Sequence, residues 1–156
     1  MKVSEIMTRN PVCCYPSSST LSATLLMQET DTGIVPVIQD PFTPILVGVV
    51  TDRDLCLHVV AAGRDPASTW ISGCMTEGPV CCTEQDDVSH ALDLMKTHQI
   101  RRLPVVNEKQ VAGRLSLSDL VCKAGIEATA IAATLRSICE PAHGAKQRIE
   151  RIFRAA

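Results

Sequence analysis

The segment Gly48-Val-Val-Thr51-Asp-Arg-Asp54-Leu55 has a counterpart 65 residues later, Gly113-Arg-Leu-Ser116-Leu-Ser-Asp119-Leu120. In both, a hydroxyl residue follows a short apolar run, and an aspartate stands three positions further on. This pattern predicts a strand that leads into a helix, with the hydroxyl at the N-cap and the aspartate as the third helical residue of a capping box. Its recurrence indicates a duplicated fold.

The duplication extends upstream of these segments. Residues 7–37 align without a gap on residues 75–105, and 11 of the 31 positions are identical. Each copy has about 60 residues, which is too short to bury a core comfortably alone, so we expect the two copies to pack as one body. We assign the parts of the chain as follows: first repeat 1–63, linker 64–70, second repeat 71–125, helical C-terminal extension 126–156.

Within a copy we expect a short strand, a helix, two strands and a second helix. Val88, Ala91, Leu92 and Met95 have the spacing of one apolar helical face. Residues 103–106 and 111–115 read as a hairpin, and residues 34–38 and 45–50 repeat it.

The extension is not repeated. It contains an Ala-rich helical stretch around residues 128–139 and a short basic helix whose apolar face carries Ile149, Ile152 and Phe153. That helix either docks on the body or contacts a partner or a membrane surface.

Composition narrows the class of protein. Fifteen basic and 17 acidic side chains give a net charge of −2, and aromatic residues make up 3% of the chain, so we expect no nucleic-acid partner. No apolar run approaches the roughly 20 residues that span a bilayer, and Glu5 and Arg9 stand where a signal peptide needs an apolar stretch. We therefore expect a cytoplasmic protein with reduced thiols.

The duplicated segment also has the chemistry of a nucleotide site. The N-terminus of a helix attracts phosphate, and the hydroxyls of Thr51 and Ser116 can donate to the same group. The carboxylates of Asp54 and Asp119 can accept both hydroxyls of a ribose. The alternative is that these residues only cap their helices.

The ordered pair of Met-Thr, Pro-Val, Leu-Met, Pro-Val and Gly-x-x-Thr/Ser-x-x-Asp-Leu motifs resembles a tandem pair of CBS (cystathionine β-synthase) domains over roughly residues 1–125. The resemblance implies an α+β fold, in which two βαββα repeats pack with pseudo-twofold symmetry as a Bateman module, followed here by the helical tail. It also implies a homodimer and two clefts for AMP, ADP, ATP or S-adenosylmethionine as a regulatory ligand, with no required cofactor.

The same resemblance implies which residues contact the ligand. Asp54 and Asp119 would bind ribose, and Thr51 and Ser116 would help to hold phosphate. Adenine would lie against residues of the early strands and of the hairpins: Val12, Cys13, Val80, Cys81, Ile34, Val35, Pro36, Arg102, Leu103 and Pro104.

Arginines distinguish the two copies. Arg101 and Arg102 stand where the first copy has Gly33 and Ile34, so they offer cationic donors near the expected phosphate. Arg53 and Arg114 could add charge, and the alternative for any one of these four arginines is a solvated surface cation. If the ligand is polyphosphorylated, we expect it in the cleft that Arg101 and Arg102 reach.

Two cysteine pairs are also repeated, Cys13-Cys14 and Cys81-Cys82. Neighbouring strand residues face opposite sides, so each pair directs one sulfur inward, and two thiols do not complete a tetrahedral zinc site. Buried cysteines are therefore favoured over a thiol or metal sensor.

The sequence contains no catalytic motif of the hydrolase, P-loop or zinc-protease type, so we do not expect an enzyme. The favoured function is an adenosine-ligand sensor that signals to an unknown protein by a conformational change. The alternative is a ligand-free dimeric scaffold.

Overall fold

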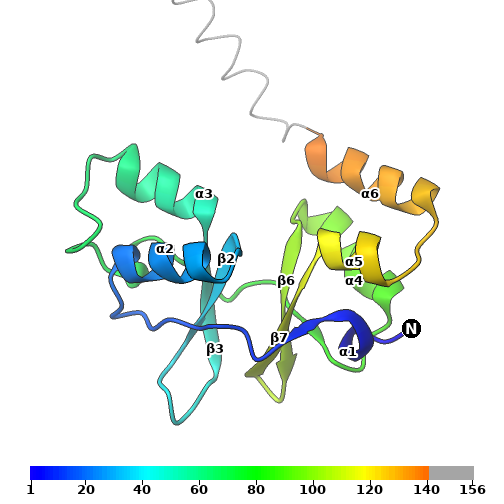
Figure 1. The fold of residues 1–156 in the computed structure, drawn as a ribbon, viewed down its shortest axis with the longest axis horizontal. Coiled ribbons are helices and arrows are strands. Elements are labelled where there is room, and N and C mark those ends of the chain that lie inside the picture. Colours follow the sequence, from blue (N-terminus) through cyan, green and yellow to red (C-terminus); the bar gives the residue numbers. More distant parts are fainter. Residues whose placement is uncertain (141–156) are drawn as a thin grey trace, which may run out of the picture.

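Two antiparallel hairpins form the centre of the structure (Figure 1). The computed structural model describes residues 1–140, and the predicted basic helix lies outside them. β2 (Ile34–Ile38) pairs with β3 (Leu46–Thr51), and β6 (Arg102–Asn107) pairs with β7 (Gln110–Ser116). Each of these strands begins and ends within one residue of the range predicted from the sequence.

One helix precedes each hairpin and another follows it. α2 (Thr20–Glu29) and α4 (Val88–His98) come before the hairpins. After them come α3 (Asp52–Leu55), which continues as the π-helix η1 (Cys56–Val60), and α5 (Leu117–Lys123). The predicted α+β fold of two βαββα repeats is confirmed.

The short first strand of each repeat belongs to the sheet of the other repeat. β1 (Thr8–Arg9) pairs antiparallel with β7, and β4 (Thr76–Glu77) pairs antiparallel with β3. β5 (Cys82–Thr83) runs parallel to β6 within its own repeat, and a bridge from Cys14 to Val37 is its counterpart. We call the body around β2 and β3 the first half, and the body around β6 and β7 the second half.

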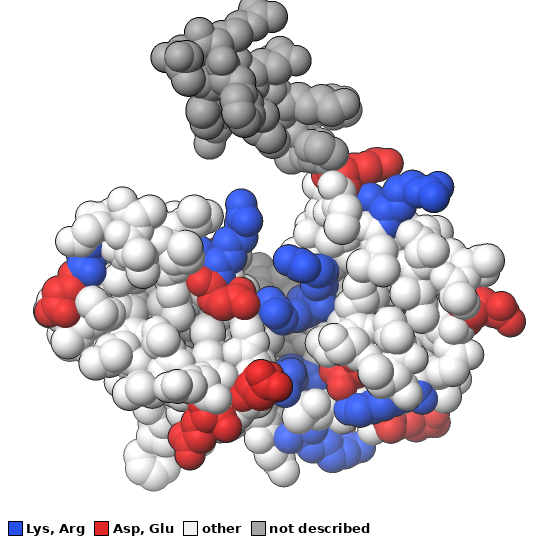
Figure 2. Space-filling model, turned by 45° about the horizontal axis from the view of Figure 1, so that its top comes forward, with Lys and Arg blue, Asp and Glu red and all other residues white. Residues whose placement is uncertain are grey.

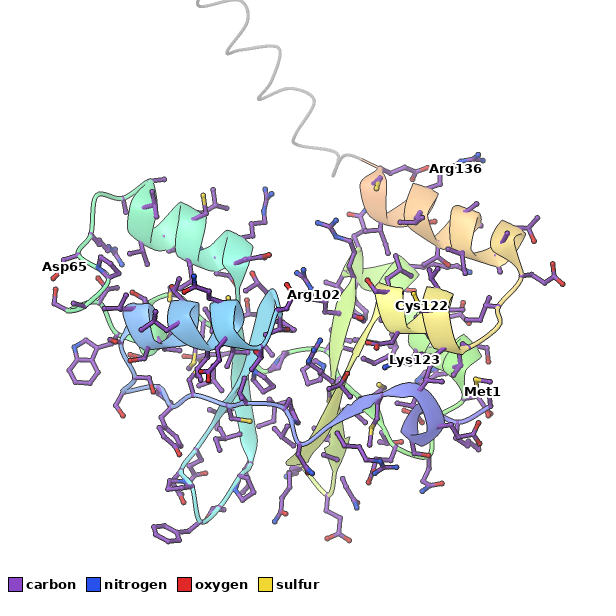
Figure 3. The ribbon with its side chains drawn as sticks, in the orientation of Figure 1. Met1, Asp65, Arg102, Cys122, Lys123 and Arg136 are labelled. Carbon is purple, nitrogen blue, oxygen red and sulfur yellow. The ribbon has the colours of Figure 1, made fainter. Side chains whose placement is uncertain are left out.

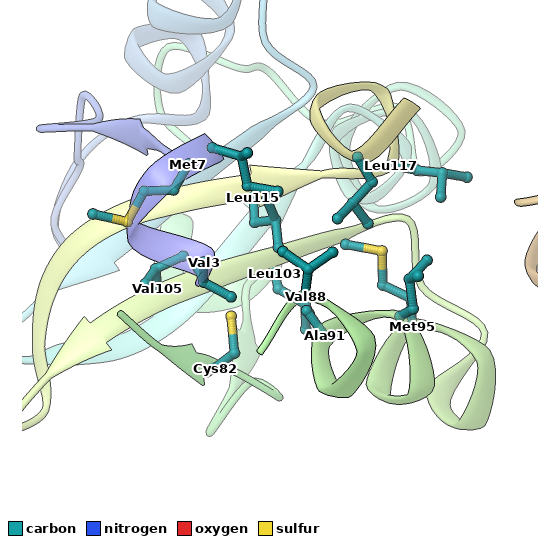
Figure 4. Close-up of a cluster of buried hydrophobic side chains, with 13 residues drawn as sticks. Val3, Met7, Cys82, Val88, Ala91, Met95, Leu103, Val105, Leu115 and Leu117 are labelled. Atoms are coloured by element: carbon teal, nitrogen blue, oxygen red, sulfur yellow. The ribbon is translucent and has the colours of Figure 1, made fainter. Parts of the chain in front are cut away.

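Each hydrophobic core likewise includes residues from the other repeat. Val3 and Met7, on and after the N-terminal helix α1 (Val3–Ile6), are buried in the core of the second half with Leu103 and Leu115 (Figure 4). Ile71, in the 3₁₀-helix η2 (Ile71–Gly73), is buried in the core of the first half. Each half therefore depends on a segment that the other repeat supplies.

One helix has no counterpart in the first half among the described residues. α6 (Ala128–Cys139) packs against α4, where Gln99 Nε2 donates to the carbonyl oxygens of Ser137 (3.0 Å) and Glu140 (3.1 Å). Ile138 of α6 packs against the second core. Within residues 1–140, no helix has both the length and the hydropathy needed to cross a membrane.

Candidate functional site

A cavity of about 400 Å³, which we call the first cleft, opens between the two halves. This volume falls within the range of pockets that hold small ligands. Figure 2 shows basic side chains gathered in the hollow between the halves, with acidic side chains beside them. Both repeats contribute to its lining, which consists of Ile34, Val49, Thr51, Asp52, Arg53, Asp54, Thr76, Pro79, Val80, His98, Ile100, Arg101, Arg102 and Pro104.

The first capping box lies on the wall of this cleft. Asp54 Oδ2 accepts hydrogen bonds from the Thr51 amide (2.9 Å) and hydroxyl (2.7 Å), and Thr51 Oγ1 accepts one from the Asp54 amide (3.2 Å). The predicted cap is therefore present. No hydrogen bond from residues 1–140 reaches Asp54 Oδ1, so this oxygen can accept a hydroxyl from a ligand.

The second capping box has the same geometry and a different environment. Asp119 Oδ2 accepts from the Ser116 amide (2.9 Å) and hydroxyl (2.5 Å), while Asp119 Oδ1 lies 2.6 Å from Lys123 Nζ. Asp119 is only 8% exposed. Burial raises its pKa, but the hydrogen bonds from Lys123 and Ser116 outweigh burial, so the pKa lies below its ordinary value.

A second cavity of about 380 Å³ lies beside α5 and α6. It is lined by Arg101, Arg102, Leu135 and residues of the second capping segment and α5, including Ser116, and Asp119 does not line it. The structure thus places both Thr51 and Asp54 on the wall of the first cleft. Of the hydrogen-bonded pair Ser116 and Asp119, only Ser116 lines the second cavity.

The arginine pair lies at the junction of the halves. Arg102 Nη1 lies 3.5 Å from Asp52 Oδ1 and donates to the carbonyl oxygen of Gly33 (3.3 Å), so it bridges the two repeats (Figure 3). Arg101 and Arg102 line both cavities. They therefore do not distinguish one cleft from the other, contrary to expectation. Arg53 lines the first cleft, and Arg114 lines neither cavity.

The residues predicted to contact adenine separate into three groups. Ile34, Val80, Arg102 and Pro104 line the first cleft. Val35 and Leu103 are fully buried in the two cores, because alternate strand residues face opposite sides, so their side chains do not line the first cleft. The others line neither the first cleft nor the second cavity: Val12, Cys13, Pro36 and Cys81.

The repeated cysteines are placed as packing residues. Cys14 and Cys82 are buried in the two cores, and burial raises the pKa of each thiol to about 12. Burial raises the pKa of Cys13 to about 11. The described part of the chain contains no group of three or more histidine, cysteine, aspartate or glutamate side chains arranged to hold a metal ion.

Some residues at these sites were missed. Thr76 is the second residue of the repeated Met-Thr motif, which signalled the duplication but not a cleft wall. Lys123 follows Asp119 by four residues, the spacing of neighbours on a helix face, and this signal was available in the sequence. Nothing in the sequence placed Asp52 opposite Arg102, because that pair joins different repeats.

Comparison with known proteins identifies the fold and the family. YlbB of Bacillus subtilis, an uncharacterized protein, is 38% identical over 119 residues, which cover 76% of this chain and 79% of YlbB. The crystal structure of Hypoxic Response Protein I with two coordinated zinc ions is similar, with a TM-score of 0.71 and 25% identity, covering 81% of this chain and all of that one.

A structure of the CBS domain pair of protein MJ0100, in complex with 5′-methylthioadenosine and S-adenosyl-L-methionine, shares the fold. Its TM-score is 0.71 at 22% identity, over 80% of this chain and 96% of that one. The family model of the CBS domain matches this chain twice, over residues 3–61 and 71–123. The chain therefore belongs to the CBS domain family and carries a tandem pair of these domains.

Proposed function

We propose that this protein is a regulatory module that binds an adenosine ligand in the first cleft and signals to another protein. The observation that carries the proposal is the position of Asp54, which is half-buried on a cleft wall with one carboxylate oxygen free of hydrogen bonds from residues 1–140. A carboxylate in this state suits the two adjacent hydroxyls of a ribose.

The rest of the lining complements the other parts of such a ligand. Ile34, Val80 and Pro104 offer an apolar surface to a purine ring. Arg53, together with the pair at the junction, offers guanidinium groups that suit phosphate oxygens. The solved complex of MJ0100 with two adenosine-containing ligands supports this ligand class.

The arginine bridge provides a route from binding to signalling. Arg102 contacts Asp52 and Gly33 across the junction, and an anionic ligand in the cleft competes with these oxygens for the same guanidinium. A ligand shifts an equilibrium between arrangements of the halves only if it binds one arrangement more tightly. We propose that this competition supplies the difference, and that the module acts as a cytoplasmic homodimer.

Thermal unfolding with AMP, ADP, ATP and S-adenosylmethionine tests the proposal. A ligand at 100 times its Kd stabilises the native state by about 2.7 kcal/mol, which for a chain of this size raises the Tm by roughly 5–11 °C. Asp54→Asn keeps an oxygen that can accept the Thr51 amide and removes the charge, so we expect the ligand-dependent rise to disappear. Asp119→Asn is the matched control, and the ligand should still raise the Tm of this variant.

If no ligand raises the Tm of the wild-type chain, and calorimetric titration also detects no binding, the sensor proposal is refuted. A dimeric scaffold would then be the remaining function.

A further inference from the structure

The two repeats differ at the residue one helical turn after the capping aspartate. His58 stands four residues after Asp54, and Lys123 stands four residues after Asp119. Only the second pair forms an ion pair, with Lys123 Nζ 2.6 Å from Asp119 Oδ1. The same ammonium group donates to the carbonyl oxygen of Ile6 (3.2 Å), so Lys123 joins α5 to the end of α1 (Figure 3).

Both oxygens of the second carboxylate are consequently engaged. Asp119 Oδ2 holds the cap and Asp119 Oδ1 holds the lysine, whereas Asp54 uses one oxygen for its cap. A ribose that approached Asp119 would replace a charged donor with neutral hydroxyls, which form weaker hydrogen bonds to a carboxylate. It would also leave the ammonium group of Lys123 without its counter-charge.

Sequence differences beside the second capping box also disfavour a ligand there. Leu117 and Ser118 occupy the positions that Asp52 and Arg53 hold in the first repeat, so the second cavity lacks the cation that Arg53 supplies to the first cleft. Leu135 of α6 also lines the second cavity, and no helix takes that position over the first half within residues 1–140.

From these contacts we infer that Lys123 occupies the ribose position of the second site as an internal substitute for a ligand, and that each chain binds one adenosine ligand, in the first cleft. This inference rests on the proposed function of the first cleft. It assigns a stoichiometry and names the side chain that sets it.

Isothermal titration calorimetry with AMP and with S-adenosylmethionine measures that stoichiometry. The wild-type chain should bind one molecule per chain. Lys123→Ala, which removes the ammonium group, and Lys123→His, which installs the residue of the first repeat, should each raise the number towards two. Lys96→Ala is the matched control, because Lys96 also pairs with an aspartate on its own helix, Asp93, at 3.5 Å. Its stoichiometry should remain at one.

The outcomes separate the two claims. Two molecules bound per wild-type chain would overturn the inference and leave the proposed function in place, as would a stoichiometry of one in both Lys123 variants. No binding to the wild-type chain or to any variant would contradict the proposed function and this inference together. The double variant Asp54→Asn/Lys123→His should bind one ligand molecule per chain, in the second site.

Discussion

The two capping aspartates make nearly identical local bonds, so exchanging each for alanine isolates what their surroundings contribute. Asp119→Ala removes the acceptor of the Ser116 amide and of the Lys123 ion pair. A hydrogen bond to a charged group contributes about 1.5–3 kcal/mol, and an ion pair with a half-exposed lysine adds at most about 1 kcal/mol. We expect Asp119→Ala to lower the free energy of unfolding by about 2–4 kcal/mol.

Asp54→Ala should lower the free energy of unfolding by less than Asp119→Ala does. Water in the first cleft can reach the Thr51 amide once the carboxylate is gone, and no lysine pairs with Asp54 within residues 1–140. A loss of about 1–2 kcal/mol is expected, because a solvated donor avoids most of the penalty of a buried one. The difference of about 1–2 kcal/mol corresponds to roughly 2–8 °C in Tm.

Urea unfolding of both variants at neutral pH measures these losses, with Lys123→Ala and the Asp119/Lys123 double variant completing a cycle that isolates the ion pair. Equal losses for the two aspartates, within about 0.5 kcal/mol, would refute the argument that their surroundings differ.

The same pair predicts a pH dependence. The pKa of Asp119 is lower in the folded chain than its ordinary value of 3.8. Its contribution to stability is therefore fully present above that ordinary value and is lost as the pH falls through the lower folded value. The gap between the wild type and Asp119→Ala should be constant near neutrality and should close in acid below about pH 4. A gap that widened in acid would contradict this sign.

Two further results are expected. In Gly113→Ala the new methyl carbon would lie 2.7 Å from Met7 Sδ and 2.9 Å from the Thr8 carbonyl oxygen, so urea unfolding should show a loss of about 1–3 kcal/mol. Gly73→Ala, where no atom of residues 1–140 lies within 4 Å of the new methyl carbon, should be neutral. Equal stability of the two variants would contradict the exchange of β1. Brief alkylation with iodoacetamide at pH 8, read by peptide mass spectrometry, should label the exposed thiols and spare the three in the cores. The exposed thiols are those of Cys56, Cys122 and Cys139, and the buried ones are those of Cys14, Cys74 and Cys82. Early labelling of the buried thiols would contradict their burial.

Local chemistry made the hairpins and caps predictable. The Thr51 and Ser116 caps follow from hydroxyl and carboxylate residues at fixed spacing, which interact within one helical turn and need no distant partner. The helix over Val88–His98 follows from its apolar stripe, and all four stripe residues are buried. Such features can be predicted from a sequence because the local pattern agrees with the global fold.

Contacts between the two repeats could not be predicted from local sequence patterns. β1 and β4 have two residues each, too few to show a period, and their partners belong to the other repeat. The sharing of Arg102 by both cavities depends on how the halves meet, which no local spacing encodes. The pairing of Lys123 with Asp119 was readable from its spacing, but whether it engages the carboxylate depends on burial.

The exchange of β1 and β4 has a consequence for how such a chain arose. A polypeptide with a single copy would lack the edge strand of its own sheet and would obtain it only from a second molecule, as an intertwined dimer. Joining two copies in one gene replaces that encounter between molecules with a tethered one, at the millimolar effective concentration of a short linker. In the tethered pair the two copies differ, since one carboxylate faces open space and its counterpart faces a lysine.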